Sequence, residues 1–186
     1  MKLSPGRCLG ILVFLALLCS SQAAAADITG FVGYLKPGKL NVQGTITALD
    51  GSPVYGFRLG LDFLPFLGHE HTIGFSSGYL VPTSVNAFTD AKGFVYNSNL
   101  VLHVKAGRVV PFATAGLGLI HQYGSPDLNL GTKFAVNYGG GLKFPKLAGP
   151  LGVRVDVRGY TAVGLPGSQK LNIIEVTGGV LLTFGK

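Results

Sequence analysis

Beyond residue 26 the apolar residues occur in short alternating runs, and this pattern constrains the fold more than any other feature of the sequence. In the clearest run, at 153–158, three valines alternate with Arg154, Asp156 and Arg158. Because successive side chains of a strand point to opposite faces, this strand has one apolar and one charged face. The run therefore predicts a strand that separates an apolar environment from a polar one.

Eight segments with this alternation are separated by turn-forming residues. They are residues 28–36, 54–64, 70–81, 96–106, 110–123, 132–144, 151–161 and 172–184. The spacers at 65–69, 107–109 and 145–150 are short, whereas those at 37–53 and 82–95 are longer. Short periplasmic turns that alternate with longer outside loops are typical of outer membrane barrels, and an even strand number places both chain ends in the periplasm.

The composition indicates a membrane rather than an aqueous environment. The chain is 47% hydrophobic and only 12% charged, whereas soluble domains carry roughly 25% charged residues. No apolar stretch beyond the N-terminal segment approaches the roughly 20 residues of a spanning helix. Since every backbone group in lipid must be paired internally, only helices and closed barrels can span. We therefore predict an all-β fold, an eight-stranded antiparallel up-and-down barrel that crosses the outer membrane.

The first 26 residues are predicted to be a cleaved secretory signal. Lys2 and Arg7 supply the positive charges, residues 9–18 form a short apolar core, and residues 23–26 are four alanines. Small residues in this position are typical of a signal-peptide cleavage site. We therefore expect the barrel domain to comprise residues 27–186. Cleavage would also remove both cysteines of the chain, which leaves the barrel without a disulfide.

The charge distribution bears on the partners of the protein. Without Lys2 and Arg7 the 15 basic residues become 13, which against 8 acidic residues leaves a net charge of +5. These charges are scattered and form no basic run with interleaved aromatics, so we expect no nucleic acid partner. The expected partners are outer membrane lipids and lipopolysaccharide, the barrel-assembly machinery, and an extracellular ligand at loops 37–53 and 82–95. No cofactor is expected.

Aromatic side chains fall near the strand ends, as in the interfacial belts of membrane barrels. The periplasmic belt is predicted to comprise Phe63, Phe66, Phe112, Phe144 and Phe184, and the outer belt Tyr55, Tyr79, Tyr123, Phe134 and Tyr160. In the first segment either Phe31 or Val32 can face lipid, so its orientation stays open.

The inward faces of the predicted strands collect charged residues. The expected lumenal network comprises Arg58, Asp62, Lys105, Arg154, Asp156, Arg158 and Glu175. Counting back from outward Phe184 turns Glu175 inward, and we expect it to bridge to Arg154 and Arg158 on the neighbouring strand. Inward glycines such as Gly116 would leave room for the long side chains. The network is expected to fill a narrow lumen, because a barrel of this size is just wide enough for side chains.

Three stretches of the chain resemble the OmpA-like family of outer membrane barrels, which includes the opacity-type and OmpX-type proteins. These stretches are residues 110–119, 137–144 and 153–160. The resemblance covers essentially the whole mature chain, and it implies a small barrel in the outer membrane. The family often has an acidic residue where Gly159 stands here.

The C-terminal segment is similar to the signal that the barrel-assembly machinery recognises. Thr177, Gly179, Leu182 and Phe184 occupy its polar, glycine, hydrophobic and aromatic positions. The sequence departs from that signal at residues 185–186, because the aromatic residue usually ends the chain.

Barrel enzymes of this size offer an alternative function. Lipid A deacylases use a lipid-facing His followed two positions later by Ser, together with a carboxylate. No histidine of this chain is followed by Ser at that spacing. His69, Glu70 and His71 could suggest a metal site, but they fall at a predicted turn and are expected to be solvated. We therefore predict that the protein is not an enzyme and has no catalytic, metal-binding or cofactor-binding residues.

The sequence thus favours an integral barrel with a polar, mostly plugged lumen, which acts as a structural or surface-interaction (adhesion-type) protein through its outside loops. Two alternatives remain. One is a narrow pore or small-hydrophobe transporter, which an opening lined by apolar residues would favour. The other is a lipid-modifying enzyme, which a His–Ser–carboxylate cluster assembled in space at the outer leaflet would favour.

Overall fold

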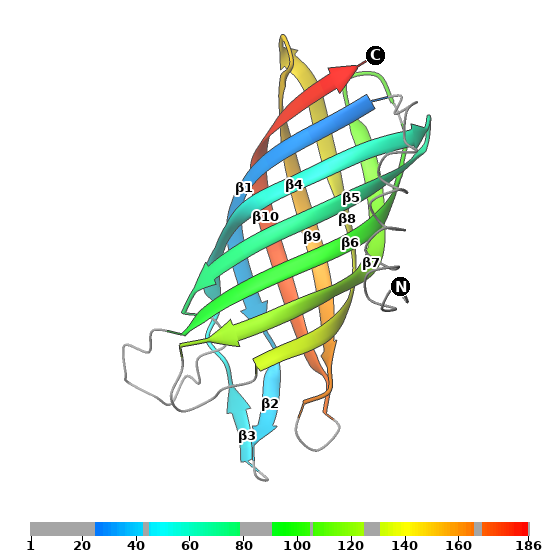
Figure 1. The fold of residues 1–186 in the computed structure, drawn as a ribbon. Coiled ribbons are helices and arrows are strands. Elements are labelled where there is room, and N and C mark those ends of the chain that lie inside the picture. Colours follow the sequence, from blue (N-terminus) through cyan, green and yellow to red (C-terminus); the bar gives the residue numbers. More distant parts are fainter. Residues whose placement is uncertain are drawn as a thin grey trace, which may run out of the picture.

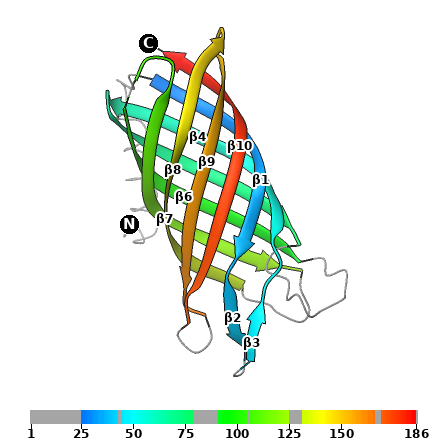
Figure 2. The same ribbon diagram turned by 180° about the vertical axis from the view of Figure 1, so that it is seen from behind.

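Eight strands of the computed structural model close into an antiparallel barrel (Figures 1 and 2), which confirms the predicted fold. The structure describes residues 25–42, 45–78, 91–104, 106–124, 131–165 and 169–185. The barrel strands are β1 (Ala25–Pro37), β4 (Ser52–Leu64), β5 (Leu67–Ser77), β6 (Lys92–His103), β7 (Val110–Tyr123), β8 (Gly131–Ala148), β9 (Leu151–Val163) and β10 (Leu171–Gly185). Pairing of β1 with β10 closes the barrel, from Ala25 opposite Gly185 to Pro37 opposite Ile173.

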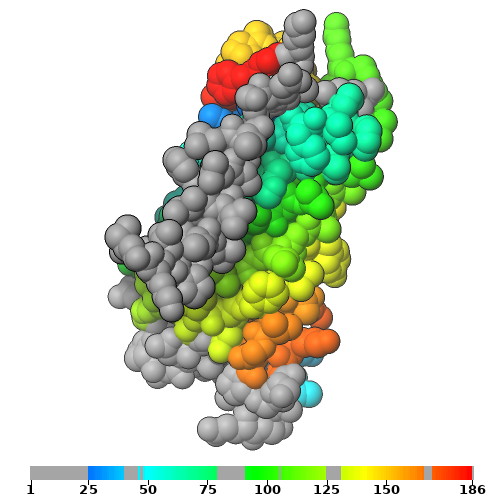
Figure 3. Space-filling view, turned by 45° about the vertical axis from the view of Figure 1, so that its right-hand side comes forward, coloured from blue at the N-terminus to red at the C-terminus, as the bar shows by residue number. Residues whose placement is uncertain are grey.

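The two ends of the barrel differ. Both ends of the described chain lie at the end that carries the short turns, and the hairpin of β2 (Lys39–Val42) and β3 (Thr45–Ala48) extends from the opposite end (Figure 1). We call these the periplasmic end and the outer end, following the usual topology of such barrels. The hairpin lies within the spacer 37–53, for which no strand was predicted. In the space-filling view the side chains of successive strands form oblique bands, which reflect the tilt of the strands (Figure 3).

Several boundaries differ from the prediction. The turn after β4 is only two residues long, Pro65 and Phe66, so His69 lies within β5. β6 begins at Lys92, because residues 92–95 pair with the end of β7. At the N-terminus, β1 begins at Ala25, three residues before the first predicted segment at 28–36.

The predicted alternation of faces is present in the barrel wall. Val153, Val155 and Val157 are exposed on the outside, whereas the charged residues between them are buried. β1, whose orientation stayed open, turns Val32 outward with 68% exposure and Phe31 inward with 4%. Among the described residues, no helix is long and apolar enough to cross a membrane.

The aromatic belts are present, with two corrections. At the periplasmic end the exposed aromatic residues of the predicted belt are Phe63, Phe66 and Phe184. At the outer end they are Tyr55, Tyr123 and Phe134. Phe112 and Tyr160, predicted for the belts, are instead buried in the lumen, because both lie on the inward face of their strands. Phe144 is half-buried, and Tyr79 lies outside the described residues.

The lumen is not polar throughout, which corrects the prediction. Its outer part is filled by a cluster of mostly apolar side chains, among them Leu35, Val54, Val95, Ile120, Ala135, Ala162, Leu171 and Ile173. Leu49 and Leu165, which lie between strands at the outer end, belong to the same cluster. The outer part of the barrel therefore has a small hydrophobic core, and the buried charged side chains among the described residues lie in the middle and at the periplasmic end.

Candidate functional site

A layer of three arginines and three carboxylates crosses the middle of the lumen. Its members are Arg58 from β4, Glu70 from β5, Arg154, Asp156 and Arg158 from β9, and Glu175 from β10. None of these residues is more than 2% exposed. Buried charges are tolerated when they are paired and hydrogen-bonded. With equal numbers of positive and negative groups, the layer as a whole is neutral.

On one side of the layer Arg154 and Arg158 share two carboxylates. Arg154 donates to Glu70 and, through Nε and Nη2, to both oxygens of Asp156 at 2.9 Å. Arg158 Nη2 donates to Glu70 Oε1 at 2.6 Å and to Asp156 Oδ1 at 3.0 Å. The paired geometry of Arg154 and Asp156 is the strong form of this interaction, because the guanidinium fork matches the two carboxylate oxygens.

On the other side of the layer Arg58 holds Glu175. Arg58 Nη2 donates to Glu175 Oε1 at 2.7 Å and to the Thr177 hydroxyl at 3.0 Å. Tyr160 donates its hydroxyl to the second oxygen of Glu175 at 2.8 Å. A longer contact of 3.4 Å joins Arg58 Nη1 to Asp156, which therefore links the two sides of the layer.

The partners of Glu175 correct the expectation from the sequence. Glu175 does lie opposite Arg158 in the register of β10 and β9. Its described ion pair, however, goes to Arg58, whereas Arg154 and Arg158 pair with Glu70 and Asp156. Long side chains inside a narrow lumen reach across it, so neighbouring strands need not supply ion-pair partners.

Glu70 is the member of the layer that the sequence analysis missed. The residue was predicted to lie at a solvated turn, but it is fully buried within β5. Two signals pointed to it. Counting back by twos from outward Phe75 and Ile73 turns His71 and His69 outward and Glu70 inward. The predicted network also held four basic and three acidic residues, an imbalance that a further carboxylate removes.

Two residues of the predicted network do not belong to the layer. Lys105 lies outside the described residues. Asp62 lies at the periplasmic end, where its Oδ2 is 3.4 Å from Nε2 of His103. Lys143 and Asp27 form an ion pair of 2.6 Å there. These side chains line a cavity of about 200 Å³ at that mouth of the barrel.

The glycines and the predicted assembly residues fit the crowded inward face. A Cβ on Gly139 would overlap the backbone oxygen of Val157 and lie 2.9 Å from Cγ of Arg158, so a larger residue would clash with the backbone of β9 as well as with that side chain. A Cβ on Gly179 would lie 2.8 Å from the Thr29 side chain. Thr177 accepts a hydrogen bond within the charge layer, and Phe184 is exposed at the periplasmic end. Recognition of this segment during assembly stays a prediction.

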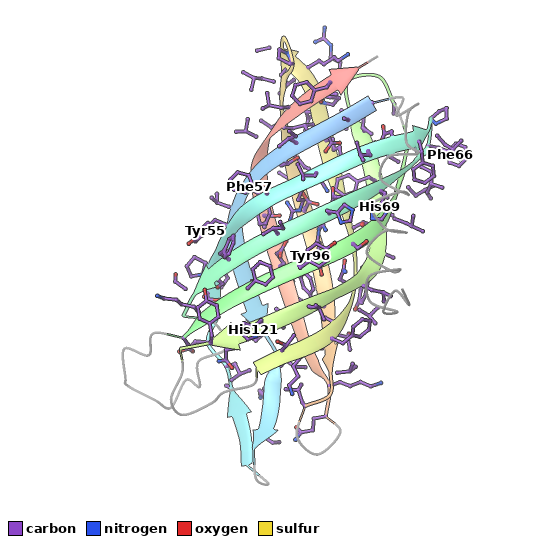
Figure 4. The ribbon with its side chains drawn as sticks, viewed as in Figure 1. Tyr55, Phe57, Phe66, His69, Tyr96 and His121 are labelled. Carbon is purple, nitrogen blue, oxygen red and sulfur yellow. The ribbon has the colours of Figure 1, made fainter. Side chains whose placement is uncertain are left out.

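A second group of polar side chains faces away from the lumen, on the wall formed by β5 and β6. His69 Nε2 lies 2.9 Å from the Ser98 hydroxyl, and His71 Nδ1 lies 2.9 Å from the Tyr96 hydroxyl. The two imidazole rings stack at 4.6 Å. His69 and Tyr96 lie on the wall turned toward the viewer (Figure 4). Within the described ranges, no group of three or more His, Cys, Asp or Glu residues could hold a metal ion.

Comparison with known proteins agrees with this architecture. Residues 11–184 match the family model of the outer membrane protein beta-barrel domain. The chain belongs to this family. It is accordingly a protein of the outer membrane, as the sequence predicted. A comparison with curated protein sequences found no significant match.

Solved structures with a similar fold are small outer membrane barrels. Neisserial surface protein A has a TM-score of 0.66 at 14% identity, with 86% of this chain and 99% of that chain covered. OprG from Pseudomonas aeruginosa has a TM-score of 0.59 at 13% identity, with 88% of this chain and 97% of that chain covered. The outer membrane enzyme PagL has a TM-score of 0.52 at 16% identity, with 86% of this chain and 99% of that chain covered. At these identities the likeness establishes the fold alone.

Proposed function

We propose that the protein is a closed outer membrane barrel that acts at the cell surface, as a structural or adhesion-type protein, through the loops at its outer end. The observation that carries this proposal is the charge layer. Its six members join strands from both sides of the lumen and are buried from water. Such a layer is suited to hold the wall rigid rather than to pass a solute.

An open pathway through the middle of the barrel would require breaking ion pairs. Breaking one buried pair costs about 3–5 kcal/mol, because the remaining charge is left uncompensated. The apolar cluster in the outer part of the lumen adds a second obstacle, since Leu35, Leu171 and Ile173 are each only 1% exposed. These side chains fill the lumen rather than line an opening, which argues against the pore and small-hydrophobe alternatives.

The outer end offers the surface on which the proposed function depends. The β2–β3 hairpin continues the chain of β1 and β4 beyond the wall of the barrel, and its Ile46 is 70% exposed. Loops carried on a rigid scaffold are frequent sites of recognition. We propose that the loops predicted at 37–53 and 82–95 contact the extracellular partner, apart from residues 92–95, which belong to β6; residues 79–90 lie outside the described ranges. Removal of residues 1–26 and delivery by the barrel-assembly machinery belong to the same proposal.

Two measurements test this function. Single-channel recording on the purified barrel should show no steady conductance, and a stable open pore would contradict the closed lumen. Cells that display the barrel should bind host cells or matrix proteins more strongly than cells without it. Replacement of residues 39–48 by a short Gly-Ser turn should remove that difference while the barrel stays folded. Equal binding with and without the loop would contradict a role for the hairpin.

The second candidate function is lipid modification, and the His69–Ser98 contact is the observation that favours it. The contact lies toward the periplasmic end of β5 and β6 rather than at the outer leaflet, so the lipid within its reach is one of the inner leaflet. A hydroxyl 2.9 Å from an imidazole nitrogen is the arrangement of a nucleophile and its base. The carboxylate that such a site uses is not supplied by neighbouring Glu70, which faces the lumen. Mass spectrometry of the phospholipids and of lipid A from cells that express wild-type protein or a Ser98→Ala variant tests this activity. A change in the structure of either lipid that depends on Ser98 would make the enzyme the better proposal.

A further inference from the structure

A groove with an apolar lining crosses the lipid-facing wall over β10, β1 and β4. Its volume is about 510 Å³. The wall is thin here because glycine occupies the outward positions Gly30 and Gly178, and a Cβ on Gly178 would meet nothing within 4 Å. The exposed side chains of Val32, Tyr55, Phe57 and Val180 form the sides. Tyr55 and Phe57 are labelled toward the left edge of the barrel (Figure 4).

The register shows how this hollow arises. Val32 lies opposite Gly178 on one side and Tyr55 on the other. One step toward the periplasm on the same face, Gly30 lies between Val180 and Phe57. Glycines thus alternate with large side chains across three adjacent strands. The volume and the apolar lining of the groove suit a hydrocarbon chain.

Basic residues lie at the outer end of the barrel, on β1 and in the segments that follow β1 and precede β10. From Val32 the outward face of β1 continues through Tyr34 to Lys36, about 13 Å farther along the strand at about 3.3 Å per residue. Lys39 begins β2, and Lys170 directly precedes β10; all three lysines are exposed.

The backbone holds these two segments together. Gly38 donates its N–H to the carbonyl of Asn172 at 2.7 Å, which fixes the start of β10 beside the chain that leads into β2. Among the described acidic residues, only Asp50 lies at this end of the barrel. The three lysines and Asp50 leave an excess of positive charge at the outer end of β1 and β10, the strands that carry the groove.

We propose that this face binds a phosphorylated, multiply acylated glycolipid of the outer leaflet, the class to which lipid A belongs. One acyl chain would lie in the groove, Tyr34 would lie at the interface where tyrosine is favoured, and the lysines would pair with the headgroup phosphates. The sequence of apolar groove, tyrosine and lysine along one face matches the order of acyl chain, interface and phosphate in such a lipid. The groove is separate from the loops and from the charge layer, and of the three lysines only Lys39 lies in the loop 37–53, so acyl-chain binding in the groove stands independently of the function proposed above.

The test is native mass spectrometry of the folded mature barrel in detergent micelles, titrated with diphosphorylated lipid A. A Lys36→Gln, Lys39→Gln, Lys170→Gln triple variant should bind with a Kd about a hundredfold higher, since each lysine near an anionic surface contributes about fivefold. The matched control, Lys92→Gln with Lys133→Gln, removes lysines at the outer ends of β6 and β8 and should stay within about twofold of wild type. Equal affinity of the triple variant and wild type would overturn the proposal.

The groove is tested separately. Gly178→Leu fills it and should raise the Kd about tenfold, the effect of about two buried methylenes. The same change should appear with lipid A from which the phosphates have been removed. Ala115→Leu, an exposed lipid-facing position on β7, is the control and should have no effect. Inorganic phosphate should not displace the lipid; displacement by phosphate, or an unchanged Gly178→Leu variant, would refute acyl-chain binding. Heat-modifiable migration on gels verifies that each variant is folded.

Discussion

Removal of the Glu70 charge is the sharpest test of the lumenal charge layer. In the Glu70→Gln variant, Arg154 keeps its two contacts with Asp156, whereas Arg158 keeps one contact of 3.0 Å with Asp156 and a longer one of 3.4 Å with Thr72. The layer changes from neutral to a net charge of +1. Breaking a buried pair costs about 3–5 kcal/mol, and we expect about 3 kcal/mol here because both arginines retain a carboxylate partner.

The same contacts predict which second substitution restores stability. Arg158→Gln removes the arginine that loses most when Glu70 is neutralised, so the double variant should recover about 1–3 kcal/mol of the summed losses. Arg58→Gln is the control, because the described ion pairs of Arg58 go to Glu175 and Asp156 rather than to Glu70. The double-mutant cycle of Glu70→Gln with Arg58→Gln should therefore give a smaller coupling free energy than the cycle of Glu70→Gln with Arg158→Gln.

The assay is urea unfolding of the purified barrel in lipid vesicles, with the free energy of unfolding extrapolated to zero denaturant. Two results would refute the reasoning. A Glu70→Gln variant within about 0.5 kcal/mol of wild type would mean that the buried pairs contribute little. Strictly additive losses in the Glu70–Arg158 double variant would mean that the two side chains do not interact.

Three further predictions follow from the wall of the barrel. Val155→Arg, which places a charge on the lipid face, should destabilise the barrel by about 2–4 kcal/mol near mid-bilayer in the same unfolding assay, and no lumenal substitution should rescue it. Phe184→Ala should lower the amount of heat-modifiable barrel in isolated outer membranes, because it removes a belt aromatic and the end of the assembly signal; wild-type levels would contradict that role. A protease-sensitive tag at Gly51 should be cleaved on intact cells and one at Gly149 protected, and the opposite pattern would invert the assigned sidedness.

Much of the barrel follows from the sequence, because successive side chains of a strand alternate between its two faces. Each residue can therefore be assigned to a face without knowledge of the neighbouring strands. The alternation of Val153 to Arg158 was sufficient to orient β9, and the scarcity of charge placed the valine face in lipid. The positions of the short turns followed from their turn residues. Strand ends do not follow from the local sequence in the same way, since the extension of β6 to Lys92 depends on its pairing with β7.

Which side chains meet inside the lumen was decided only by the tertiary structure. Alternation turned Glu175 inward, but closure of β1 against β10 determines that Arg58, from the strand beyond β1, reaches it. Likewise Tyr160, predicted for an interfacial belt, donates to Glu175. The physical reason is that facing is a local property of a strand, whereas contacts across the lumen depend on register, tilt and closure, which join residues far apart in the chain.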